Sequence, residues 1–160
     1  MRTRSLQPGD AAPDFRARLT TGEEIQLSDF RGKKHVVLFF YPKDFTPGCT
    51  AEVCSFRANY EALTQCDAVL LGVSFDDEQT HEAFMHRHRL PFSLISDRDH
   101  AIARAYGADG RLWGMLPGAK RLTFVIDKEG IIRRIVHHEI QIGKHLDGVL
   151  EALRELCTST

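Results

Sequence analysis

Three segments of the chain consist almost entirely of apolar residues and have the length of strands. They cover residues 35–41 (HVVLFFY), 68–74 (AVLLGVS) and 122–126 (LTFVI). A strand with one exposed face alternates apolar and polar residues, whereas a strand covered on both faces is apolar throughout. The three segments therefore predict the central strands of a sheet packed between two layers.

Between these segments, apolar residues recur every three or four positions, which is typical of helices that pack one face against a core. Val53, Phe56, Tyr60 and Leu63 follow this spacing and predict a helix that runs from about residue 47 to Leu63. The same criterion predicts helices over 78–89, 99–106 and 145–156.

Two short turn signals predict hairpins. The sequence DKEG at 127–130 separates strands at 122–126 and 131–136, and TTG at 20–22 separates strands at 15–19 and 24–27. We expect one domain over residues 1–160, an α/β three-layer sandwich with a mixed central sheet flanked by helices. The pattern fits a thioredoxin-like fold, but periodicity alone does not separate that fold from other α/β sandwiches.

Composition narrows the function classes. The chain has 160 residues and a formal net charge of −1, so no basic field favours nucleic acid or an anionic membrane as a partner. No apolar run approaches the ~20 residues of a membrane span. The first ten residues include basic side chains but lack the apolar core of a secretory signal. We therefore expect a cytoplasmic protein.

The segment TPGCTAEVC, residues 46–54, carries the candidate chemistry. Thr46 is a good N-cap and Pro47 is favoured at the first helical position, so Cys49 is expected in the first turn of the helix. Backbone N–H groups without helical partners and the positive end of the helix dipole favour a thiolate there. We expect a lowered pKa for Cys49 and a nucleophilic role. The alternative is a small buried apolar residue.

The spacing between Cys49 and Cys54 constrains what the pair can do. Five residues of helix advance about 7.5 Å and rotate about 140°, whereas a disulfide needs Cα atoms within about 7 Å and converging side chains. The two thiols therefore either never bond or bond only when the helix start unwinds. The spacing also fits poorly with zinc and iron–sulfur sites, so no metal is expected.

These residues resemble the peroxiredoxin family. Pro42, Thr46 and Cys49 match its P-x-x-x-T-x-x-C signature, and Cys54 matches the second cysteine of the bacterioferritin-comigratory-protein or PrxQ subgroup. Further segments resemble the family in order along the chain: 9–15, 71–74, 90–97 and 121–127.

The resemblance implies a thiol peroxidase without cofactor or metal. Cys49 would attack a peroxide oxygen and become a sulfenic acid, assisted by backbone N–H groups, the Thr46 hydroxyl and a guanidinium. Arg121 matches the family arginine, and Arg57 is the second candidate. On the resemblance alone, Pro42 would shield the sulfur from water.

The resemblance also implies that Cys54 resolves the sulfenic acid as an intramolecular disulfide, which thioredoxin or a similar dithiol then reduces. Four cysteines are too few for a disulfide scaffold in a chain of this length. Cys66 precedes a core strand, Cys157 lies in the terminal tail, and neither matches a functional position of the family. We interpret both as incidental small apolar residues.

Two other functions remain as alternatives. A thioredoxin-like disulfide oxidoreductase would use C-x-x-C, and a copper-binding protein of thioredoxin-like fold would use C-x₃-C with a histidine. The C-x₄-C spacing fits neither. A monomer is favoured over a small homodimer, because the chain has no long arm after its last predicted helix.

Overall fold

The main sheet is built around β3 (His35–Phe40), its third strand in spatial order. A computed structural model of the protein describes residues 5–112, 116–137 and 142–158. The sheet order is β5-β4-β3-β8-β9. Strands β3, β4 and β5 run parallel, whereas β8 is antiparallel to both β3 and β9. The bounds are β4 Ala68–Ser74, β5 Ser93–Ser96, β8 Leu122–Ile126 and β9 Ile132–His137. The predicted mixed sheet is therefore confirmed.

From Val36 to Phe40, strand β3 is apolar because both of its faces are buried. Val36, Leu38 and Phe40 point into one core cluster. Val37 and Phe39 point into the other. This alternation follows from the two-residue repeat of a strand, and it explains why residues 36–40 carry no polar side chain.

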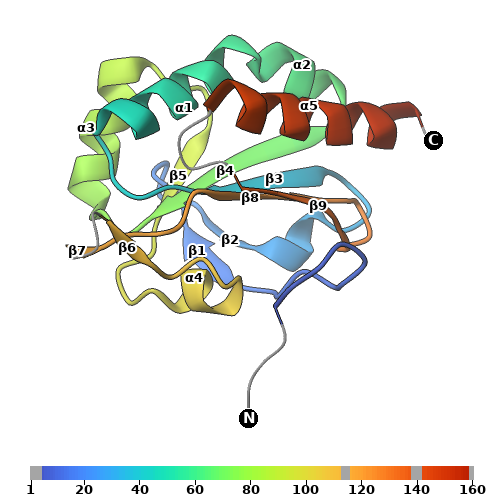
Figure 1. The fold of residues 1–160 in the computed structure, drawn as a ribbon, viewed down its shortest axis with the longest axis horizontal. Coiled ribbons are helices and arrows are strands. Elements are labelled where there is room, and N and C mark those ends of the chain that lie inside the picture. Colours follow the sequence, from blue (N-terminus) through green and yellow to red (C-terminus); the bar gives the residue numbers. More distant parts are fainter. Residues whose placement is uncertain (1–4, 113–115, 138–141, 159–160) are drawn as a thin grey trace.

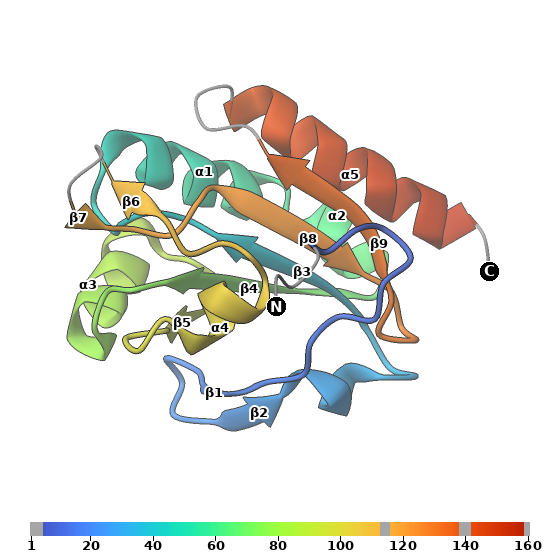
Figure 2. The same ribbon diagram turned by 60° about the horizontal axis from the view of Figure 1, so that its bottom comes forward.

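Helices cover one face of the sheet, and shorter elements cover the other (Figure 1). On the first face lie α1 (Pro47–Ala58), α2 (Tyr60–Gln65), α3 (Glu78–His88) and α5 (Ile142–Thr158). On the second face lie α4 (Ala101–Ala105), the 3-10 helix η1 (Leu27–Phe30) and the hairpin of β1 (Arg16–Arg18) and β2 (Glu24–Gln26). Figure 2 shows this hairpin on the side of the sheet opposite α5. The three-layer α/β arrangement agrees with the prediction.

The helix predicted to reach Leu63 is divided at Asn59. This residue ends α1 and precedes α2, and its side-chain Nδ2 donates to the Ser55 carbonyl oxygen at 2.9 Å. An asparagine side chain competes with the backbone for such bonds, which favours a break. Both predicted hairpins are present. The short strands β6 (Arg111–Leu112) and β7 (Leu116–Pro117) were not predicted.

The last helix is longer than its pattern indicated. It begins at Ile142 and ends at Thr158, so Cys157 lies in its final turn and not in a tail. Among the residues that the structure describes, no helix is both long and apolar enough to cross a membrane.

Candidate active site

The antiparallel pairing of β3 and β8 brings two distant segments together. The register places Phe40, the last residue of β3, opposite Leu122, the first residue of β8. Tyr41 and Arg121, the next residues outward, therefore leave the sheet at the same edge. The loop from β3 to α1 starts at this edge and carries Pro42 and Thr46. The pairing therefore places a cation beside the start of α1.

Cys49 lies in the first turn of α1 and is completely buried, with an exposed fraction of 0%. Pro47 occupies the first position of the helix and Thr46 is its N-cap residue. The N–H groups of the first turn have no partner within a helix, so they are available to a group at that end. The sulfur is thus held against the core at the positive end of the helix.

Arg121 contacts this sulfur directly. Its Nη2 donates to Cys49 Sγ at 3.6 Å, and its Nη1 donates to Glu52 Oε1 at 3.2 Å. Glu52 is buried on α1 one turn after Cys49, which places both side chains on the same face. Gly48 allows the close approach, because a Cβ there would lie 3.0 Å from Arg121 Nη2.

The expected lowering of the Cys49 pKa is wrong for this folded state. Burial of the sulfur raises the pKa of the Cys49 thiol above its ordinary value. Arg121, the Thr46 hydroxyl and the Lys43 backbone lower that pKa, and Glu52 raises it. Desolvation outweighs the cation because the sulfur has lost all contact with water, which the helix pattern alone did not show.

The loop between β3 and α1 holds the two other residues of the signature. The Thr46 hydroxyl donates to the Lys43 carbonyl oxygen at 2.7 Å and does not cap the helix through its side chain. Pro42 is half-buried where the loop begins. Phe45, just before Thr46, has a positive φ of 64° and is 50% exposed. Phe45 thus has the left-handed backbone that L-residues rarely adopt.

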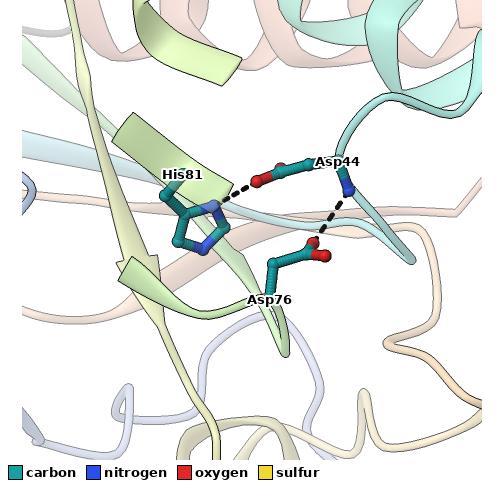
Figure 3. Close-up of side chains that lie close together, drawn as sticks. All are labelled: Asp44, Asp76 and His81. Carbon is teal, nitrogen blue, oxygen red and sulfur yellow. Dashed lines mark hydrogen bonds and ion pairs between the residues drawn. The ribbon is translucent and has the colours of Figure 1, made fainter. Parts of the chain in front are cut away.

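A polar network of Asp44, Asp76 and His81 holds the loop between β3 and α1 in place (Figure 3). Asp44 Oδ1 accepts from the Tyr41 hydroxyl at 2.5 Å, and Asp44 Oδ2 lies 2.6 Å from His81 Nδ1. The Asp44 backbone N–H donates to Asp76 Oδ2 at 2.8 Å, and that oxygen also accepts from Ser74 Oγ. Burial raises the pKa of Asp44, and the hydrogen bond from His81 opposes that rise.

The carboxylates Asp44 and Asp76, with His81, lie close enough to hold a metal ion. Their hydrogen bonds favour another interpretation, since Tyr41 and His81 already bond both oxygens of Asp44, and Ser74 bonds Oδ2 of Asp76. The network ties the loop to α3 and to the end of β4. We interpret it as a scaffold for the loop that carries Thr46.

The remaining candidates, Cys54 and Arg57, contact α3 and not Cys49. Cys54 is half-buried, and both Cys49 and Cys54 are free thiols. Cys54 Sγ lies 3.9 Å from His88 Nδ1 on α3. Arg57, the second arginine candidate, donates through Nη1 to the His88 carbonyl oxygen at 2.6 Å, so it is engaged at α3.

The interpretation of Cys66 and Cys157 as incidental is wrong, because a disulfide joins them. Cys66 follows α2 and Cys157 lies in the last turn of α5, with Cα atoms 5.4 Å apart and 91 residues between them in sequence. Neither cysteine belongs to a local motif, and only the tertiary fold brings the end of α2 to the last turn of α5.

Sequence reasoning missed Glu52, Asp44 and His81. Glu52 carried a usable signal, since a carboxylate three residues after Cys49 must share its helix face. Asp44 and His81 carried none, because 37 residues separate them and they lie on different elements.

The model of the AhpC/TSA family matches residues 8–135 of the chain. Among curated proteins, the chloroplastic peroxiredoxin Q of Populus jackii is 42% identical over 151 residues, which are 94% of this chain and 70% of that protein.

Two solved structures have the same fold. Peroxidoxin BcpB from Mycobacterium tuberculosis superposes with a TM-score of 0.86 at 34% identity, covering 94% of this chain and 97% of that chain. The bacterioferritin comigratory protein of Xanthomonas campestris, described for its alkyl peroxide reduction activity, superposes with a TM-score of 0.80 at 31% identity. This superposition covers 89% of the present chain and 92% of the Xanthomonas campestris chain.

Proposed function

The chain belongs to the AhpC/TSA family and is a thiol peroxidase of the peroxiredoxin Q type, and from that premise we propose that Cys49 attacks the peroxide and Cys54 resolves the product. One observation carries the assignment of Cys49: its buried sulfur lies in the first turn of α1 and accepts a hydrogen bond from Arg121. The other free thiol, Cys54, lies farther along the same helix.

In the first step, the Cys49 sulfur attacks one oxygen of the peroxide. The S–O bond forms as the O–O bond breaks, and the leaving oxygen takes a proton to become water or an alcohol. Arg121 and the first-turn N–H groups donate to the oxygens as charge moves onto the leaving oxygen. The Thr46 hydroxyl can turn from the Lys43 carbonyl oxygen to the same position. Pro42 would limit access of water.

Burial raises the pKa of Cys49, so it opposes formation of the thiolate. A cation at 3.6 Å then has a specific task. Arg121 stabilises the thiolate that reacts and also the charge that develops during transfer, without being consumed.

In the second step, the first turns of α1 must unwind. Cys49 and Cys54 are both helical in the reduced protein and do not bond. The start of the helix is weak, since Gly48 and Thr50 both have low helix propensity. Unwinding lets Cys54 reach the sulfenic acid, and it exposes the new disulfide to a reductant. Slow unwinding would permit further oxidation of Cys49.

We propose hydrogen peroxide and organic hydroperoxides as substrates, and thioredoxin or a similar dithiol as reductant. The activity described for the Xanthomonas campestris relative supports the organic class. The C-x₄-C spacing continues to disfavour a thioredoxin-like oxidoreductase and a copper carrier. We also propose a monomer that acts without nucleic acid or membrane.

The cytoplasm is the compartment we propose. Disulfides of cytosolic proteins are usually transient or redox-sensing, so there Cys66 and Cys157 would interconvert between thiols and the disulfide. A count of alkylatable thiols in protein isolated under acid quench tests this. Complete oxidation of the pair in growing cells would contradict a reducing compartment.

Peptide mapping of the protein after one equivalent of peroxide tests the proposed cycle. We expect a new disulfide between Cys49 and Cys54, and faster amide exchange across residues 47–56. Peroxide consumption coupled to a thioredoxin system measures turnover. A bond from Cys49 to any other cysteine, with residues 47–56 still protected, would contradict the mechanism.

A further inference from the structure

His88 is the side chain that faces the proposed resolving thiol from another helix. Its Nδ1 lies 3.9 Å from Cys54 Sγ, at a half-buried position between α1 and α3. The distance is long for a hydrogen bond, but catalytic hydrogen bonds are often long before the reacting complex forms. When Nε2 carries the proton, Nδ1 can accept from the Cys54 S–H group.

The imidazole is held in place by its surroundings. Its ring packs edge-on against Phe84 at a centroid distance of 5.0 Å and lies 6.4 Å from Phe45. Phe45 and Phe84 also contact each other at 5.0 Å. The ring is therefore ordered by the same loop that precedes Thr46.

A second contact holds Cys54 at this place. Arg57 lies one helical turn after Cys54, and its Nη1 donates to the His88 carbonyl oxygen at 2.6 Å. This bond joins the second half of α1 to the end of α3. Unwinding of the first turns of α1 can move Cys49 while Cys54 stays beside His88.

Arg57 is the charged group that contacts His88, and its Nη1 donates to the His88 carbonyl oxygen. A guanidinium has only donors and cannot accept a proton. Of the two side chains, His88 is therefore the one that can take the Cys54 proton, and its Nδ1 lies within 3.9 Å of Cys54 Sγ.

We propose that His88 is the general base for Cys54 in the resolving step; this rests on the proposed function, in which Cys54 resolves. His88 Nδ1 takes the thiol proton, and the Cys54 sulfur attacks Cys49 Sγ. The S–S bond forms as the S–O bond of the sulfenic acid breaks, so Cys54 is oxidised and Cys49 is reduced. The leaving hydroxide takes the proton back from His88 and departs as water. Arg57 is a positioning residue.

The test separates the two chemical steps. Peroxide is mixed rapidly with the protein, the reaction is stopped by alkylation, and mass spectrometry counts sulfenic acid and disulfide. In His88→Gln and His88→Ala, formation of the sulfenic acid should keep its rate within twofold. Formation of the Cys49–Cys54 disulfide should slow by about 100-fold, the low end of what a general base contributes. Added imidazole should restore much of that rate in His88→Ala.

His86→Ala is the matched control, because it removes an exposed imidazole from the same helix turn and should change neither step. Unchanged disulfide formation in both His88 variants would overturn the proposal. Slow formation that imidazole does not restore would also overturn it, since that result indicates a structural role. If the unaltered protein forms no Cys49–Cys54 disulfide at all, the proposed function fails instead.

Discussion

The chain contains two pairs of cysteines: the pair that is close in sequence is not bonded, and the pair that is far apart in sequence is bonded. Cys49 and Cys54 are five residues apart and remain free thiols on one helix. Cys66 and Cys157 are 91 residues apart and form a disulfide between the ends of two helices. Helical geometry separates the near pair, whereas the tertiary fold brings the distant pair together.

The difference teaches how one domain can give two cysteine pairs different roles: the near pair takes part in the reaction, and the distant pair links two helices when its disulfide is formed. The near pair lies where α1 begins, after Thr46, Pro47 and Gly48. Unwinding this first turn costs little free energy, because helix ends open more easily than helix interiors. The distant pair lies beyond the break at Asn59, where the disulfide ties α2 to α5. We infer that opening of α1 during turnover does not spread past this tie.

The largest expected effect is on peroxide reduction, which should depend on Cys49 and not on Cys66. Cys49→Ser should abolish peroxide reduction, because a hydroxyl has a far higher pKa than a thiol and does not replace the nucleophile. Cys66→Ser should retain most of the activity. A coupled thioredoxin assay measures both, and an active Cys49→Ser variant together with an inactive Cys66→Ser variant would reverse the assignment.

The next effect concerns the cation of the reactive pair. Arg121→Ala should slow sulfenic acid formation by about 100- to 1,000-fold, the scale of one preorganised donor. It should also raise the pKa of Cys49 further, since Arg121 lowers that pKa. The pH profile of the alkylation rate should therefore move to higher pH.

Arg134→Ala is the control for the loss of an arginine, because Arg134 forms a half-exposed ion pair with Glu151 on α5. It should leave both measurements unchanged. An alkylation profile and a peroxide rate that are equally unchanged in Arg121→Ala would remove Arg121 from the site.

The distant pair should matter for stability more than for chemistry. Loss of the disulfide in Cys66→Ser/Cys157→Ser should lower the free energy of unfolding by about 2–4 kcal/mol, because the open chain gains conformational freedom when unfolded. Urea titration of the oxidised protein measures this. Cys54→Ser, which leaves that disulfide intact, is the comparison. Equal unfolding midpoints would show that the tie contributes little.

The smallest expected effect concerns the pKa of Cys49, which Arg121 lowers and Glu52 raises. Glu52→Gln keeps an oxygen for Arg121 but removes the negative charge that raises the pKa of Cys49. The alkylation profile should move to lower pH by less than the opposite shift in Arg121→Ala, because Glu52 is the smaller influence on that pKa. A shift to higher pH would show that Glu52 acts mainly by holding Arg121 in place.

Much of the fold followed from local pattern. The strands at β3, β4 and β8, both hairpins and most helices were predicted, since burial on two faces leaves an apolar run and burial on one face leaves a helical repeat. The break at Asn59 and the short strands β6 and β7 were not predicted. Short elements and breaks depend on single side-chain contacts that leave no periodic trace.

The sequence by itself determined the motif of Pro42, Thr46 and Cys49, the expectation of a helix start at the reactive cysteine, and a spacing to Cys54 that forbids a bond within the helix. Those are local properties, set by residue type and by the rise and rotation of a helix. Tertiary structure alone decided that burial raises the pKa of Cys49, that Asp44 meets His81, and that Cys66 bonds to Cys157. Each of these depends on groups from distant parts of the chain and on the exclusion of water between them, which no local pattern records.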